Sequence, residues 1–77
     1  MTIMISFNCK SFDMRKEIMG YLENIYGRGI SFIDKGVICS SVVKTKDSGL
    51  LKKFKEARDF FIGNSKVTDF VVFEVKN

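Results

Sequence analysis

With 77 residues, the chain has room for one hydrophobic core and is too short for two, so we expect a single domain over residues 1–77. Its net charge of +4 permits a nucleic-acid or acidic-protein partner without requiring one, and its 45% hydrophobic content argues against disorder. Histidine, the commonest general base, is missing, and two cysteines alone cannot form a structural zinc site. We therefore expect no enzyme, no metal and no cofactor.

The N-terminal residues contain neither a basic leader nor a small-residue cleavage site, and no apolar run approaches the roughly 18 residues of a membrane helix. These patterns predict a cytoplasmic protein with reduced cysteines. Cys9 and Cys39 are expected on neighbouring strands, where their thiols could lie close together. Without a C-x-x-C motif, the simpler interpretation is that both are small buried hydrophobic residues.

Residues 2–9 alternate partly between apolar and polar side chains, which predicts a strand. The face expected to point inward carries Ile3, Ile5, Phe7 and Cys9. Ser11 can cap a helix from about Phe12 to Tyr26, and Gly27 is a typical residue just beyond a helix C-terminus. The apolar residues of this helix recur at helical spacing: Met14, Ile18, Tyr21, Leu22 and Ile25.

Residues 30–33 and 37–45 are rich in β-branched residues and are separated by Asp34-Lys35-Gly36, which predicts a hairpin with its turn at 34–36. Asp47 or Ser48 can then cap a second helix from about Gly49 to Ile62. Residues 66–76 form the last predicted strand.

This βαββαβ order resembles the ferredoxin-like α+β fold, in which a hairpin links two right-handed crossovers. The resemblance implies a four-stranded antiparallel sheet in the order 4-1-3-2, with both helices on one face. Many unrelated functions share this fold, so it predicts an architecture and no activity.

The last strand is apolar on both of its alternating faces, although only one face can point into a core beneath the helices. Val71, Phe73 and Val75 are expected to point inward. The remaining side chains, predicted to form a protein-binding surface on the open side of the sheet, are Met4, Ile38, Val42, Phe70 and Val72. The leading hypothesis is a small non-enzymatic protein-binding module, a regulator or inhibitor, that acts through this face or an edge strand and could be a homodimer.

The alternative hypothesis is a nucleic-acid-binding module with a cationic pole at one end of the sheet. The residues that the topology would gather there are Arg28, Lys44, Lys46 and Lys76, beside the N-terminus of the second helix. Base stacking as in RNA-recognition motifs is not expected, because residues 37–45 contain no aromatic side chain. Lysines on the second helix are not counted, because acidic residues four positions away can neutralise them.

Overall fold

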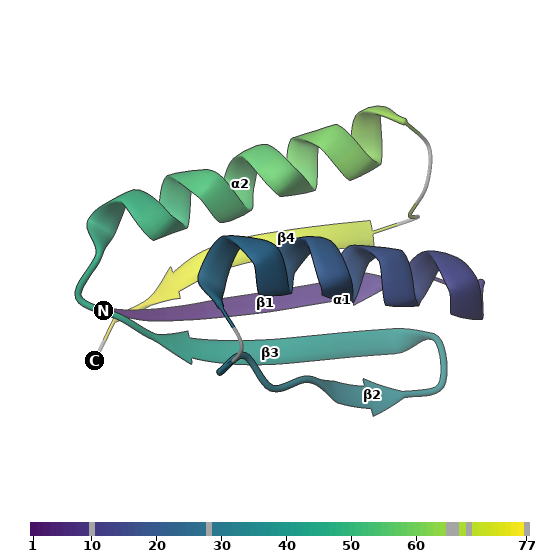
Figure 1. The fold of residues 1–77 in the computed structure, drawn as a ribbon, viewed down its shortest axis with the longest axis horizontal. Helices are drawn as coiled ribbons and strands as arrows, with labels where there is room; N and C mark the ends of the chain where they lie inside the picture. The colour runs from purple at the N-terminus through teal and green to yellow at the C-terminus, as the bar shows by residue number, and fades with distance from the viewer. Residues whose placement is uncertain (10, 28, 65–66, 68, 77) are drawn as a thin grey trace.

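The computed structural model describes residues 1–9, 11–27, 29–64, 67 and 69–76. Its elements follow the order βαββαβ (Figure 1). They are β1 (Thr2–Asn8), α1 (Phe12–Tyr26), β2 (Ile33–Lys35), β3 (Ile38–Lys44), α2 (Ser48–Gly63) and β4 (Asp69–Val75). Within the described residues, neither helix is long and apolar enough to cross a membrane.

The four strands form one antiparallel sheet in the order β2-β3-β1-β4. Both helices lie on the same face of this sheet, and the described part of the chain leaves the opposite face uncovered (Figure 1). This arrangement confirms the ferredoxin-like α+β fold and the strand order 4-1-3-2.

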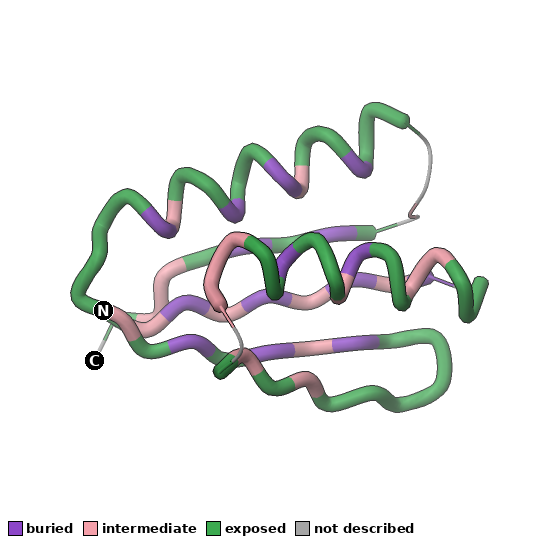
Figure 2. Tube along the Cα trace, viewed as in Figure 1, coloured by how far each residue is buried: buried purple, intermediate pink, exposed green. Residues whose placement is uncertain are grey.

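The core lies between the sheet and the two helices, where β1, β3 and β4 contribute alternate residues (Figure 2). On β1 these are Ile3, Ile5 and Phe7, as the alternation predicts, and all are at most 1% exposed. The helices cover them with residues at helical spacing: Ile18, Leu22, Leu50, Phe54, Ala57 and Phe61. Burial of this apolar layer is the main source of stability for a chain of this length.

The helix ends follow the capping residues in the sequence. The Ser11 hydroxyl accepts a hydrogen bond from the Met14 amide (3.2 Å), and the Asp47 carboxylate accepts one from the Gly49 amide (2.9 Å). Gly27 has a φ of 112° at the end of α1, a conformation that favours glycine. The predicted ends of α1 are confirmed, and α2 extends one residue beyond the prediction at each end.

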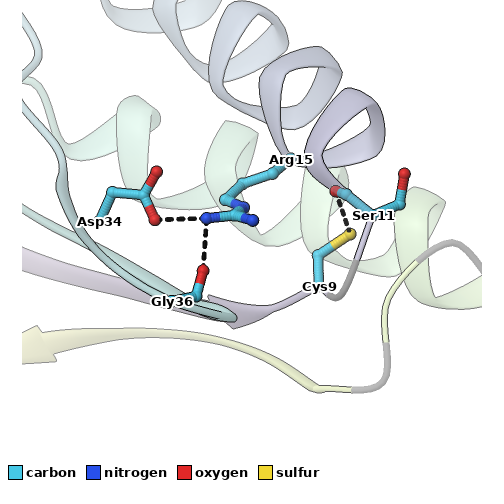
Figure 3. A network of polar contacts seen from close by, with 5 residues as sticks. All are labelled: Cys9, Ser11, Arg15, Asp34 and Gly36. Carbon is cyan, nitrogen blue, oxygen red and sulfur yellow. Dashed lines mark hydrogen bonds and ion pairs between the residues drawn. The ribbon is translucent and has the colours of Figure 1, made fainter.

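The position of the second strand was predicted wrongly. It spans Ile33–Lys35 instead of residues 30–33, and the turn falls at Gly36 and Val37, with Gly36 at a φ of 68°. Arg15 of α1 explains the shift, because its guanidinium donates hydrogen bonds to the Asp34 carboxylate (2.5 Å) and the Gly36 carbonyl oxygen (Figure 3). Asp34 is thereby held within the strand and not in the turn.

Candidate protein-binding face of the sheet

The side of the sheet opposite the helices, called the open face below, carries the strand residues that alternate with the core residues. Five of its apolar side chains are between 41% and 61% exposed. They are Ile33, Ile38, Val42, Val71 and Phe73, which come from three different strands. Met4 lies between Val42 and Phe73 in the register and is half-buried.

The strand register arranges the open face in four rows that cross the sheet. From β2 to β4, the rows are Lys35–Ile38–Asn8–Asp69, Ile33–Ser40–Ser6–Val71, Val42–Met4–Phe73 and Lys44–Thr2–Val75. The third row is apolar throughout. Since directly opposite residues in antiparallel strands have their Cβ atoms about 5 Å apart, this row forms a continuous apolar strip.

Two serines at the centre of the open face satisfy part of each other's hydrogen-bonding needs. The Ser40 hydroxyl donates a hydrogen bond to the Ser6 hydroxyl oxygen across the β1–β3 pair (3.2 Å). A polar group that has a partner within its own chain costs less to remove from water than an unpaired one. The centre of the face can therefore be covered at a smaller desolvation cost.

The prediction of which side of β4 faces outward was wrong. Phe70 and Val72 are 2% and 5% exposed and belong to the core, whereas Val71, Phe73 and Val75 lie on the open face. The register decides this, because Phe70 pairs with Phe7 and Val72 with Ile5, both of which point toward the helices.

Three residues predicted for the binding surface, Met4, Ile38 and Val42, do lie on the open face. The sequence interpretation missed Ile33 because it placed that residue at the end of its strand, beside the turn. It missed Val71, Phe73 and Val75 because the two faces of β4 are almost equally apolar, and their partners on β1 were the signal that could have separated them.

β4 forms one edge of the sheet and β2 the other. The β4 edge is seven residues long, and the three-residue β2 is shorter than a typical strand. An edge strand presents backbone amides and carbonyls that another strand can pair with. The edge-strand route of the protein-binding hypothesis would therefore use β4.

The predicted cationic residues that the structure describes lie at one end of the sheet. Lys44 and Lys46 line an open pocket of about 420 Å³ together with Met1, Thr2 and Thr45. Lys76 follows Val75, which pairs with Thr2 in the same row as Lys44, and it is exposed. Arg28 lies outside the described residues.

Contacts within the chain already occupy part of this pole. The Met1 amino group donates a hydrogen bond to the Thr45 carbonyl oxygen (2.6 Å), and Asp47 accepts the Gly49 amide at the N-terminus of α2. On the open face, β1 and β3 are described completely and carry no aromatic residue, and Phe7 is buried in the core. The two central strands therefore offer no stacking platform for bases.

Both cysteines are buried beneath the helices, and no disulfide joins them. Cys39 pairs with Phe7, and the Cys9 amide donates to the Val37 carbonyl oxygen (2.8 Å), so the two cysteines are diagonal neighbours across β1 and β3. Burial raises the pKa of the Cys39 thiol to about 11, with a further increase from Asp34 that Arg15 partly offsets. Cys39 is thus protonated and shielded at neutral pH, which is unfavourable for nucleophilic chemistry.

No protein-family model matches the chain, and no curated protein matches it. Among the described residues, no three or more His, Cys, Asp or Glu side chains are grouped so that they could hold a metal ion.

Proposed function

We propose that this chain is a non-enzymatic protein-binding module, of the regulator or inhibitor type, that binds its partner through the open face. The observation that carries the proposal is the apolar row Val42–Met4–Phe73, which crosses three strands on the face that α1 and α2 leave uncovered. With the neighbouring Ile33 and Val71, the exposed apolar surface reaches several hundred Å², about the size at which such patches on soluble proteins often mark interaction sites.

Apolar side chains that are exposed singly are common on protein surfaces and require no partner. The exposed aromatic residues on the helices are weaker candidates, because each already packs against a neighbour in its own chain. Tyr21 stacks on Phe60 with ring centroids 6.0 Å apart, and the Phe12 ring lies near the cationic groups of Arg15 and Lys16. The open face differs because its apolar residues are contiguous and its central polar pair is satisfied internally.

Charge on the open face indicates what kind of surface would fit it. Lys35 and Asp69 lie at opposite ends of the first row, and Lys44 lies in the last row, while the two rows between them carry no charge. A complementary partner would present an apolar centre and place charges of both signs at its margin. This is the usual organisation of a protein interface, with an apolar core and a polar rim.

Site-specific photo-crosslinking tests this proposal. Val42→benzoylphenylalanine places the reactive group at the centre of the open face, and Lys52→benzoylphenylalanine places it on the exposed side of α2 as a matched control. We expect position 42, and not position 52, to crosslink to one protein that mass spectrometry identifies, the same chain included. Unlabelled wild-type chain should compete, whereas a Val42→Asp chain should not. Equal crosslinking from both positions, or none from position 42, would contradict the proposal.

A second candidate function is nucleic-acid binding at the pole formed by Lys44, Lys46 and Lys76. The pocket between Met1 and Lys46 favours it, because none of its lining residues is acidic. Phosphate binding there should weaken with added salt, with a log–log slope of about −0.7 to −0.9 per contact. Lys44→Gln together with Lys46→Gln should reduce that slope. Unchanged mobility of a single-stranded oligonucleotide at low salt would reject this function.

A further inference from the structure

We propose that the partner of the open face is a second copy of the same chain, bound face to face about a two-fold axis that runs parallel to the strands between β1 and β3. This inference rests on the proposed function, because it identifies the partner of the same surface. The open face supports it by being complementary to itself under this one rotation.

The rotation places β1 opposite the partner's β3 and β2 opposite the partner's β4. Each row of the open face then lies opposite the same row of the partner. In the first row, Lys35 is on β2 and Asp69 is on β4, at opposite ends. The axis therefore places Lys35 against the partner's Asp69, and symmetry repeats this pair at the other edge. Such self-complementarity is required of a two-fold interface, in which one patch meets its own copy.

The two central rows match in the same way. In the second row, Ile33 lies opposite the partner's Val71, and Ser40 lies opposite the partner's Ser6. In the third row, Val42 lies opposite the partner's Met4. In these pairs apolar groups meet apolar groups, and hydroxyls meet hydroxyls. Phe73 has no β2 residue opposite it, and in the first row Ile38 lies opposite the partner's Asn8.

The other simple two-fold axis, which crosses the strands at right angles, gives a poor match. It would exchange the first row with the fourth, so that Lys44 would lie opposite the partner's Ile38 and Asp69 opposite the partner's Val75. Asp69 would then lie against an apolar side chain and not against a counter-ion, which is less favourable. The charge pattern thus selects the axis parallel to the strands.

Lys35 and Asp69 are available for pairing between copies. The ion pairs within the described residues are Arg15–Asp34 and Arg58–Asp59, and neither includes Lys35 or Asp69. Both residues are exposed in the single chain. Lys44 lies in the last row, at the margin of the face, where a long side chain can keep its ammonium group in water.

The size of the face determines how strong the dimer can be. With strands about 4.8 Å apart and a rise of about 3.4 Å per residue, the four strands offer a footprint of roughly 400 Å² per copy, so the dimer covers about 800 Å² in total. Specific stable interfaces bury at least about 1,200 Å², so this dimer is weak and depends on protein concentration. Its two sheets would pack about 10 Å apart, with strand directions within about 30°.

Sedimentation velocity between about 10 µM and about 1 mM, at low salt, tests the inference. We expect a monomer–dimer equilibrium that Lys35→Glu or Asp69→Lys weakens about tenfold, because each change reverses both symmetry-related pairs. The double variant Lys35→Glu/Asp69→Lys should restore association to within about twofold of wild type. Lys52→Glu, the matched change of charge on α2, should leave association unchanged.

Each outcome bears on the inference. A wild-type chain that stays monomeric at the highest concentration overturns the second copy as partner, while crosslinking from position 42 still decides separately whether the face binds another protein. A dimer that survives Val42→Asp overturns the face as its interface. A dimer that the charge exchange does not restore overturns the axis. Thermal melts equal to wild type establish that each variant is folded.

Discussion

Phe70 stacks on Phe7 across the β1–β4 pair, with ring centroids 5.3 Å apart and planes 25° from parallel. Phe61 of α2 also stacks with Phe70, with ring centroids 6.3 Å apart. A column of three aromatic rings therefore ties the edge strand to the central strand and to the helix above it. Aromatic packing of this kind adds about 0.5–1.5 kcal/mol per pair beyond the burial of area.

This column predicts opposite roles for two phenylalanines of β4. Phe70→Ala should lower the free energy of unfolding by about 3–5 kcal/mol, because it leaves a cavity in the core. Phe73→Ala should lower it by less than about 1 kcal/mol, because Phe73 is 47% exposed on the open face. Urea denaturation of a dilute sample measures both values. Similar losses for the two variants would show that the assignment of the faces is wrong.

The sequence interpretation assigned the inward and outward faces of β4 the wrong way round for a physical reason. β1 alternates between apolar and mainly polar residues, so its inward face was predicted correctly. β4 carries large apolar residues at successive positions, and the free-energy difference between its two orientations depends on its neighbours in the sheet. Pairing of Phe70 with Phe7 decides the orientation, and this pairing joins residues 63 positions apart in the chain. Local periodicity contains no information about such a pairing.

Arg15 is predicted to fix the β2–β3 hairpin to α1. Its side chain is 11% exposed, and its guanidinium contacts both Asp34 and the Gly36 carbonyl oxygen (Figure 3). Arg15→Ala should lower the free energy of unfolding by about 1–3 kcal/mol, because it leaves these acceptors without their donor. Arg58→Ala removes the exposed pair with Asp59 and should change stability by less than about 1 kcal/mol.

Hydrogen exchange gives the local readout of the same variant. The amides of Ile33–Lys35 should exchange faster in Arg15→Ala. The exchange rates of the β1 and β4 amides should change only as much as the global free energy of unfolding requires. Uniform acceleration across the whole sheet would mean that Arg15 does not act on the hairpin specifically. The Arg58→Ala chain provides the baseline for this comparison.

Two glycine substitutions should have opposite signs. Gly36 has a φ of 68° in the hairpin turn, so Gly36→Ala should lower the free energy of unfolding by about 1 kcal/mol through backbone strain. Gly20 lies within α1, where an added Cβ would meet no atom within 4 Å. Gly20→Ala should raise stability by about 0.5–1 kcal/mol, because alanine favours the helix. Thermal melts of the two variants, run side by side, check the signs, and a stabilising Gly36→Ala would contradict the turn.

The raised pKa of Cys39 predicts a pH dependence of stability. Burial raises this pKa from 9.0 to about 11, so the folded chain keeps a proton that the unfolded chain releases as the pH rises through this interval. The free energy of unfolding should therefore fall above pH 9, by on the order of 2 kcal/mol once the folded thiol also ionises. Cys39→Ala should show a smaller fall over the same range. Parallel curves for the two chains would show that Cys39 does not contribute.

The other predictions from the sequence were correct where the deciding contact is local and wrong where it joins residues far apart in the chain. Helix ends were predicted within one residue because caps such as Ser11 and Asp47 act on amides two or three positions away. The start of β2 was misplaced because Arg15, nineteen residues earlier, holds Asp34. The open face was predicted as a surface, but only Met4, Ile38 and Val42 of its apolar residues were assigned to it correctly, because the assignment depends on the register between strands.

The pairing of Thr2 with Val75 has a consequence for how the chain is ordered. Because β1 begins where β4 ends, and the two are antiparallel neighbours, a short connection could join them as an ordinary hairpin. The path through the six elements is thus nearly a closed ring. A circular permutant opened at the exposed Gly36–Val37 turn would lose only the covalent link between β2 and β3. Every pair of neighbouring strands in the sheet would stay hydrogen-bonded.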